Sequence, residues 1–156
     1  TQHHSSAASD VYKRQVNLVF ALDEALKMMR EEGLDNIFQR HNKHKLAMSN
    51  AVKALNLKLF ADEKYLSPSI TAIKTEGIDA EEFRKTIKNN FDILLAGGQD
   101  HLKGKIFRVG HLGYVNDRDI ITVVSAMSNT LLKLGKISAQ QAGEALVVAS
   151  RYLEEN

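Results

Sequence analysis

The sequence predicts an α+β fold in which helices pack on one face of a small, largely antiparallel sheet. Apolar residues recur at helical spacing in several segments, and the spacing changes to the alternation typical of strands in others. In chain order these segments read α-α-β-β-α-β-β-α-α. Because each such element has an apolar side that must be buried against another element, this order predicts a layer of helices over a sheet.

Two helices begin the pattern, at residues 17–32 and at about 35–55. The first repeats apolar residues at helical spacing and carries more of them in between, so we expect it to be buried on more than one side. Gly33 follows as the residue that ends it. The repeating positions of this helix are Leu18, Leu22, Leu26 and Met29.

Short strands and three further helices follow. The strands are predicted at residues 57–60, 69–75, 92–96 and 105–110. The remaining helices are predicted at residues 79–91, 117–134 and about 138–154. Asp79 is expected to cap its helix, because an aspartate there can accept hydrogen bonds from the free N–H groups of the first turn.

Residues 1–15 differ in character from the rest of the chain. They are polar, show no periodicity and lead abruptly into the apolar pattern at Val16. The stretch SSAASDVYKRQ resembles a string that recurs in translated metagenomic assemblies. We therefore interpret residues 1–15 as a non-native or artefactual leader and leave them out of the fold.

Composition excludes several classes of function. The chain carries 21 basic and 19 acidic residues, a formal net charge of +2, and they are mixed along its length. This is not the basic stripe of a nucleic-acid-binding protein, so no nucleic-acid partner is expected. The apolar runs are far shorter than the ~20 residues that span a bilayer, so no membrane partner is expected either. With no cysteine, the chain fits a reducing cytoplasm, where we expect the protein to reside.

The segment that says most about function is KIFRVGHLG, residues 105–113. Alternation along a strand places Phe107 and Val109 on one face and Ile106, Arg108 and Gly110 on the other. If helices cover the first face, Arg108 points from the uncovered face. A guanidinium group on a rigid strand suits a ligand carboxylate, because it can form two parallel charge-assisted hydrogen bonds. From the pattern alone, an ordinary solvated arginine is the alternative.

Three motifs together carry a family resemblance. They are GGQDHLKGKIFRVGHLG at residues 97–113, EGL at residues 32–34 and the pair Arg40–His41. With these motifs the chain resembles the class V (fold type I) pyridoxal-phosphate aminotransferases of the alanine–glyoxylate and serine–glyoxylate type. Proteins labelled soluble hydrogenase small subunit fall in the same family.

The resemblance covers residues 16–156 and matches the C-terminal small domain of this family. It implies that residues 16–33 are a connecting helix at the boundary of a large domain and that residues 34–156 are the small domain. It also implies that Arg108 binds the substrate's α-carboxylate. The family's Schiff-base lysine and most other contacts to pyridoxal 5'-phosphate would lie upstream of Val16, so no catalytic or cofactor-binding residue is assigned in this chain.

The parent enzyme would therefore be a pyridoxal-phosphate-dependent transaminase. It would move an amino group from a small amino acid, alanine or serine, to glyoxylate or a similar 2-oxo acid. The implied partners are these substrates, the missing large domain and a second subunit in a homodimer. The chain by itself is expected to bind no cofactor and to be inactive.

The histidines have two interpretations each. His111 follows the arginine strand, so it could line the substrate entrance or pack within its loop. His41 and His44 stand three residues apart on one helix, a spacing that suits a metal ion or two partly buried structural histidines. The sequence places no third ligand nearby, so no metal site is predicted.

A second class of function stays open on the residues alone. Because no complete catalytic set occurs in the chain, it could be a free-standing α+β binding or regulatory module. A long upstream reading frame that encodes a catalytic lysine would favour the enzyme over this module.

Overall fold

The computed structural model describes residues 6–154, with side chains from residue 15 onward. The chain forms two compact units, residues 1–39 and 40–156.

The first unit consists of helix α1 (Ser6–Glu32) and the start of helix α2 (Leu34–Ala54). Gly33 separates the two helices with a φ of +83°, a left-handed conformation that suits glycine. The prediction that the helix starts at residue 17 was wrong, because α1 already begins at Ser6 within the proposed leader. Residues 1–5 of that leader lie outside the described residues, and its non-native origin stays a prediction.

Helix α1 exposes its apolar side chains. Leu18 and Phe20 are each 69% exposed, and Leu22 is 58% exposed. The expectation that this helix is buried on more than one side is therefore not met by the chain itself. Isolated apolar side chains are common on protein surfaces, but a whole helix of them is typical of a surface that another chain segment covers.

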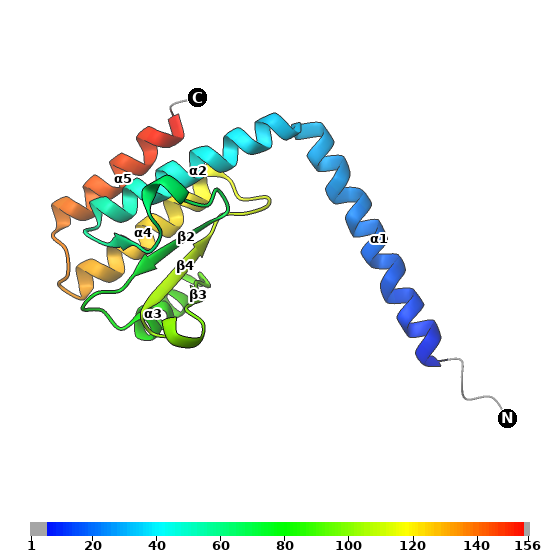
Figure 1. Ribbon diagram of the computed structural model, residues 1–156, viewed down its shortest axis with the longest axis horizontal. Coiled ribbons are helices and arrows are strands. Elements are labelled where there is room, and N and C mark those ends of the chain that lie inside the picture. Colours follow the sequence, from blue (N-terminus) through cyan, green and yellow to red (C-terminus); the bar gives the residue numbers. More distant parts are fainter. Residues whose placement is uncertain (1–5, 155–156) are drawn as a thin grey trace. The chain divides into compact units, whose positions relative to one another are not determined.

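The second unit contains a four-stranded sheet whose order is β1-β2-β4-β3. All the pairings are antiparallel, and β2 and β4 form the longest ladder. Figure 1 shows β2 and β4 beside each other and β3 at the edge. The strands are β1 (Lys58–Leu59), β2 (Ile70–Lys74), β3 (Ala96–Gly97) and β4 (Ile106–Gly110).

Helices cover one face of this sheet. The continuous apolar core joins Ile73, Phe107 and Val109, which share a face, to side chains of every helix in the unit. This confirms the predicted α+β class, and no helix in the described part of the chain is long and apolar enough to cross a membrane. Besides α2, the helices are α3 (Ala80–Phe91), α4 (Asp117–Lys133) and α5 (Ala139–Glu154), with short 3-10 turns η1 (Glu63–Tyr65) and η2 (Asp100–Leu102).

The predicted strand at residues 92–96 was wrong in its extent. Asp92 ends α3 in a left-handed conformation, φ 55°, and its N–H donates to the Lys88 carbonyl at 3.0 Å. The chain then needs several residues to reach the sheet, and pairing begins only at Ala96. Leu94 is 78% exposed, whereas Leu95 is buried. The apolar run at residues 93–95 therefore buries Leu95 in the core without forming strand pairing.

Candidate functional site

Strand β4 has two unlike faces. Phe107 and Val109 are almost completely buried, at 1% and 2% exposure. Arg108 is half-buried and Gly110 is exposed on the opposite face. The alternation predicted from the sequence is therefore confirmed from Phe107 to Gly110, whereas Ile106, on the face of Arg108, is buried at 4% exposure.

The cross-strand neighbours of Arg108 on its own face are small. Antiparallel pairing places Ala72 of β2 and Ala96 of β3 directly beside it. Residues that pair directly across strands share a face, so these two methyl groups flank the arginine. A Cβ atom added at Gly110 would meet no atom within 4 Å. Arg108 thus has short neighbours across the strands and open space toward Gly110, whereas Ile106 on its other side along β4 is buried.

One backbone contact fixes the orientation of the Arg108 side chain. Its Nε donates a hydrogen bond to the carbonyl of Gly97 at 3.0 Å. Within residues 15–154 the structure gives Arg108 no other side-chain hydrogen bond or ion pair. The two Nη groups therefore keep four N–H donors for an incoming anion, such as a carboxylate.

The side chain of His111, which follows β4, lies on the same side as Phe107 and Val109, opposite to Arg108, and is completely buried. Its Nδ1 donates to the Pro68 carbonyl at 3.1 Å, since a carbonyl can only accept. Its Nε2 is then the unprotonated nitrogen and accepts from the Thr71 hydroxyl at 2.9 Å. Burial is the main reason that the pKa of His111 is lowered to about 4; the nearby His44 and His41 act in the same direction, and the hydrogen bond to the Pro68 carbonyl opposes them. These contacts account for the packing role of His111, while a contact with substrate stays a prediction.

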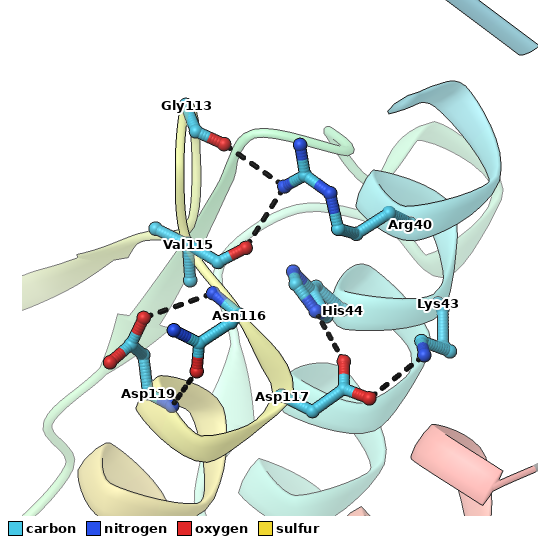
Figure 2. Close-up of polar contacts among 8 residues, drawn as sticks. All are labelled: Arg40, Lys43, His44, Gly113, Val115, Asn116, Asp117 and Asp119. Carbon is cyan, nitrogen blue, oxygen red and sulfur yellow. Dashed lines mark hydrogen bonds and ion pairs between the residues drawn. The ribbon is translucent and has the colours of Figure 1, made fainter. Parts of the chain in front are cut away.

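Side chains of helix α2 hold the loop after β4 by hydrogen bonds to the backbone of the loop (Figure 2). Nη1 of Arg40 donates to the carbonyls of Gly113 and Val115, at 3.0 and 2.9 Å. The N–H of Gly113 donates to Nε2 of His41 at 3.3 Å. Gly113 has a φ of +88°, which only glycine adopts without strain. The loop thus has a defined path even though it is on the surface.

A second group of contacts ties the start of α4 to α2 (Figure 2). Asp117 accepts from Nε2 of His44 at 2.8 Å and from Nζ of Lys43 at 2.9 Å. Asn116 and Asp119, which stand on either side of Asp117 in the sequence, form a reciprocal capping box at the start of α4. Burial is the largest influence on His44 and lowers its pKa, although the hydrogen bond to Asp117 opposes this effect. Its Nδ1 has no hydrogen-bond partner within the described structure.

The histidines of α2 have structural partners. His41 contacts the loop backbone and His44 contacts Asp117, as described above. Among the described residues, no group of three or more His, Asp or Glu side chains could hold a metal ion. The burial of His41 and His44 and their contacts with Gly113 and Asp117 agree with the interpretation of both as partly or fully buried structural residues.

The sequence pattern missed two residues that shape this site. Arg84 of α3 contacts the connection that leads into β3, with its Nε donating to the Leu95 carbonyl at 2.8 Å. Thr71 of β2 provides the hydroxyl that fixes the ring of His111. Neither residue stands in a motif, and both become meaningful only when the sheet brings distant segments together. Arg40 was part of a family motif, but the motif did not indicate its role in holding the loop.

Comparisons with known proteins identify the fold and the family. At 53% identity over 138 residues, or 88% of the chain, the chain matches a protein named soluble hydrogenase, small subunit, from Synechococcus sp. (strain PCC 6716). At 32% identity over 149 residues it matches the (S)-ureidoglycine–glyoxylate transaminase of Bacillus subtilis, and at 33% over 148 residues the serine–glyoxylate aminotransferase of Methylorubrum extorquens. The chain is a relative of the class V aminotransferases.

Solved structures agree. The ureidoglycine–glyoxylate aminotransferase of Bacillus subtilis superimposes with a TM-score of 0.78 over 85% of this chain, at 32% identity. The pyridoxamine–pyruvate aminotransferase of Mesorhizobium loti gives a TM-score of 0.79, at 26% identity. The chain spans about one third of the length of these proteins, 35% and 34% respectively. No protein-family model matches the chain.

Proposed function

We propose that this chain is the substrate-carboxylate-binding small domain of a pyridoxal-phosphate-dependent aminotransferase. The parent enzyme moves an amino group from a small amino acid, alanine or serine, to glyoxylate or a similar 2-oxo acid. Relatives that span this domain are named as glyoxylate aminotransferases, which supports the reaction class. The expected compartment is the cytoplasm, because the chain uses no cysteine.

The position of Arg108 carries the proposal. It stands on the uncovered face of a central strand, between two alanines, with its Nε already bound to the Gly97 carbonyl. An arginine held in this way loses little side-chain entropy when its two Nη groups grip a carboxylate. The amino donor and the 2-oxo acceptor both carry a carboxylate next to the reacting carbon, so one arginine can serve both half-reactions.

We assign the cofactor site to the large domain of the parent and not to the described residues. A lysine that forms a Schiff base needs an amine with a lowered pKa, which burial provides. No lysine among residues 15–154 is buried, and Lys43, Lys53 and Lys58 pair with carboxylates at 2.9, 3.0 and 2.7 Å. The cofactor, when bound to the parent, supplies the electron sink for amino transfer. This chain supplies the anchor that orients the substrate's carboxylate.

The chain alone is accordingly expected to show no transaminase activity. We assign the apolar surface of α1 to the large domain of the same parent, and the functional unit to a homodimer. The support is the length of protein that the chain leaves unmatched, about two thirds of each relative. A shallow apolar hollow of about 320 Å³ where α1 meets α2, lined in part by Leu26, Met29 and Leu34, belongs to the same surface.

Substitution of Arg108 in the full-length parent tests the proposed function. Arg108→Ala should lower kcat/KM by roughly 10- to 150-fold, the range for hydrogen bonds to a charged group. Arg108→Lys keeps the charge but loses the two-pronged geometry, so it should also be impaired. The loss should be similar for amino donor and 2-oxo acid. The absorbance of the bound cofactor should be unchanged.

Arg118 provides a matched control, because it is an exposed arginine of the same unit. Arg118→Ala should leave kcat/KM within twofold of the wild-type value. If Arg108→Ala also left both substrates within twofold, the assignment would be wrong. If it removed the cofactor, Arg108 would hold phosphate or structure and not the substrate.

The apolar surface of α1 gives a separate prediction for the chain as it stands. Without a large domain to cover it, the chain should self-associate as its concentration rises. Replacing Leu18 and Leu22, which are 69% and 58% exposed, by Glu should shift the equilibrium to monomer. Sedimentation velocity over a hundredfold concentration range measures this; a wild-type chain that stays monomeric throughout would contradict the prediction.

A further inference from the structure

Arg108 donates its Nε hydrogen bond to the carbonyl of Gly97, and this contact limits how its guanidinium group can bind a carboxylate. A guanidinium can pair with a carboxylate side-on, through Nε and one Nη, or end-on, through the two Nη groups. The Nε–Gly97 hydrogen bond of 3.0 Å occupies the side-on donor. A carboxylate on this face must therefore be bound end-on, and the carbonyl of Gly97 sets its direction.

The strand that carries this carbonyl has little support of its own. β3 comprises Ala96 and Gly97 and is an edge strand that pairs with β4. Two-residue edge strands make few ladder hydrogen bonds, so their position depends on contacts from outside the sheet. The orientation of Arg108 is then only as well defined as the contacts that hold β3.

Arg84 of helix α3 makes those contacts from the helix-covered side of the sheet. Its Nε donates to the Leu95 carbonyl at 2.8 Å, immediately before β3. Its guanidinium lies directly against Gly97, because a Cβ atom added there would stand 2.6 Å from Arg84 Nη1. Glu81, one turn earlier on α3, binds the same Nη1 at 2.7 Å and holds the group in place.

The backbone next to β3 is equally restricted on the other side. A Cβ atom at Gly98 would stand 2.1 Å from the carbonyl oxygen of Leu102, in the turn η2. The N–H of Gly98 donates to the Ile106 carbonyl at 3.1 Å. The strand therefore lies between Arg84 on one side and η2 on the other, and a loss of Arg84 frees it on the side of α3.

We propose that Arg84 is a positioning residue for substrate binding, which acts through Leu95 and Gly97 on the side chain of Arg108. Arg84 itself touches no substrate. This inference rests on the proposed function, because it refines how Arg108 is held. Lysine cannot replace Arg84 fully, since its single nitrogen cannot reproduce the separate contacts of Nε and Nη1.

A double-mutant cycle in the full-length parent tests the proposal. Arg84→Ala should lower kcat/KM by about 3- to 10-fold for amino donor and 2-oxo acid alike, mainly through KM, a smaller loss than that of Arg108→Ala because Arg84 does not bind the carboxylate itself. In an Arg108→Ala background, Arg84→Ala should change kcat/KM by less than twofold, because the residue through which it acts is gone.

Lys85→Ala is the matched control, since Lys85 is the next residue of α3 and is exposed. It should leave kcat/KM within twofold in both backgrounds. Should Arg84→Ala fail to fold, as judged by circular dichroism, Arg84→Lys keeps the charge and carries the same cycle. Its loss should be smaller than that of Arg84→Ala and should vanish in the same way when Arg108 is absent.

The outcomes separate this inference from the proposed function. Losses from Arg84→Ala that multiply fully with those from Arg108→Ala would overturn the inference, because Arg84 would then act independently. A loss below twofold from Arg84→Ala, with a large loss from Arg108→Ala, would overturn the inference and leave the proposed function intact. If Arg108→Ala had no effect, the proposed function would fail and the inference with it.

Discussion

The two faces of β4 and of the loop that follows it are built for different tasks. Phe107, Val109 and His111 point inward and are at most 2% exposed. Arg108 and Gly110 alternate with them and face outward, where short neighbours leave room for a ligand. The buried inward residues hold the strand in place, and the outward side chain of Arg108 is positioned by that strand. In the proposed role of Arg108, the position of the arginine is therefore fixed by side chains that do not contact the ligand.

The largest expected effect contrasts Phe107 with Arg108 in the stability of this chain. Phe107 is 1% exposed, and its ring centroid lies 5.0 Å from that of Phe83. Phe107→Ala should lower the free energy of unfolding by about 3–5 kcal/mol, the usual cost of a large cavity in a core. Arg108→Ala should cost about 1 kcal/mol or less, because it removes one hydrogen bond at the surface.

Urea denaturation followed by circular dichroism measures both values. Val109→Ala, in the same row of the core, should fall between them. Equal losses from Phe107→Ala and Arg108→Ala would mean that the two faces are not specialised as described.

A smaller effect is the pH dependence that His111 gives to the inward face. Its pKa is 6.5 in a model peptide and about 4 in the folded chain, so the unfolded chain binds the proton first as the pH falls. The free energy of unfolding should therefore fall between pH 6.5 and 4 and level off below. From pH 7 to pH 5 the loss from this group is about 2 kcal/mol. His44, whose pKa is also lowered, acts in the same direction.

Unfolding free energies at pH 7 and pH 5 check this. His111→Gln should reduce the difference between the two pH values, whereas His101→Gln, an exposed histidine in the turn η2, should leave it unchanged. A stability that does not depend on pH in this range would show that His111 is not held in its neutral form.

The sequence predicted the inward face well because burial follows periodicity. Alternation along β4 and helical spacing in α3 and α4 depend on local geometry, and the core cluster contains the apolar residues that these patterns indicated. The arginine on the outward face was also predicted, since the same alternation defines both faces. The proposal that it binds a carboxylate needed the family resemblance, because a solvated arginine has the same pattern.

What the sequence did not predict depends on distant segments. The extent of β3 was wrong because pairing partners, and not apolar composition, decide where an edge strand begins. Arg84 and Thr71 were missed because their partners, Leu95 and His111, are brought to them by the fold. The exposure of α1 differed from the expectation because an apolar helix pattern predicts burial without stating which chain segment covers the helix.

Within the loop after β4, the backbone and the side chains should respond differently to substitution. Gly113 has a φ of +88° and binds both Arg40 and His41 through its backbone. Gly113→Ala should therefore cost about 1–2 kcal/mol, the penalty for a side chain in the left-handed region. Leu112 beside it is 68% exposed, so Leu112→Ser should cost far less. Urea denaturation of the two variants side by side provides the measurement.

Tyr114→Ser is the smallest expected effect and the sharpest check on the outward side of this loop. The Tyr114 side chain is 81% exposed, so its removal leaves no cavity and should change the free energy of unfolding by no more than about 0.5 kcal/mol. The carbonyls of Gly113 and Val115 on either side stay bound to Arg40 in this variant, which keeps the path of the loop. A loss of 2 kcal/mol or more would mean that the tyrosine packs within this unit, and the outward side of the loop would then belong to the core instead of to a surface open to other segments.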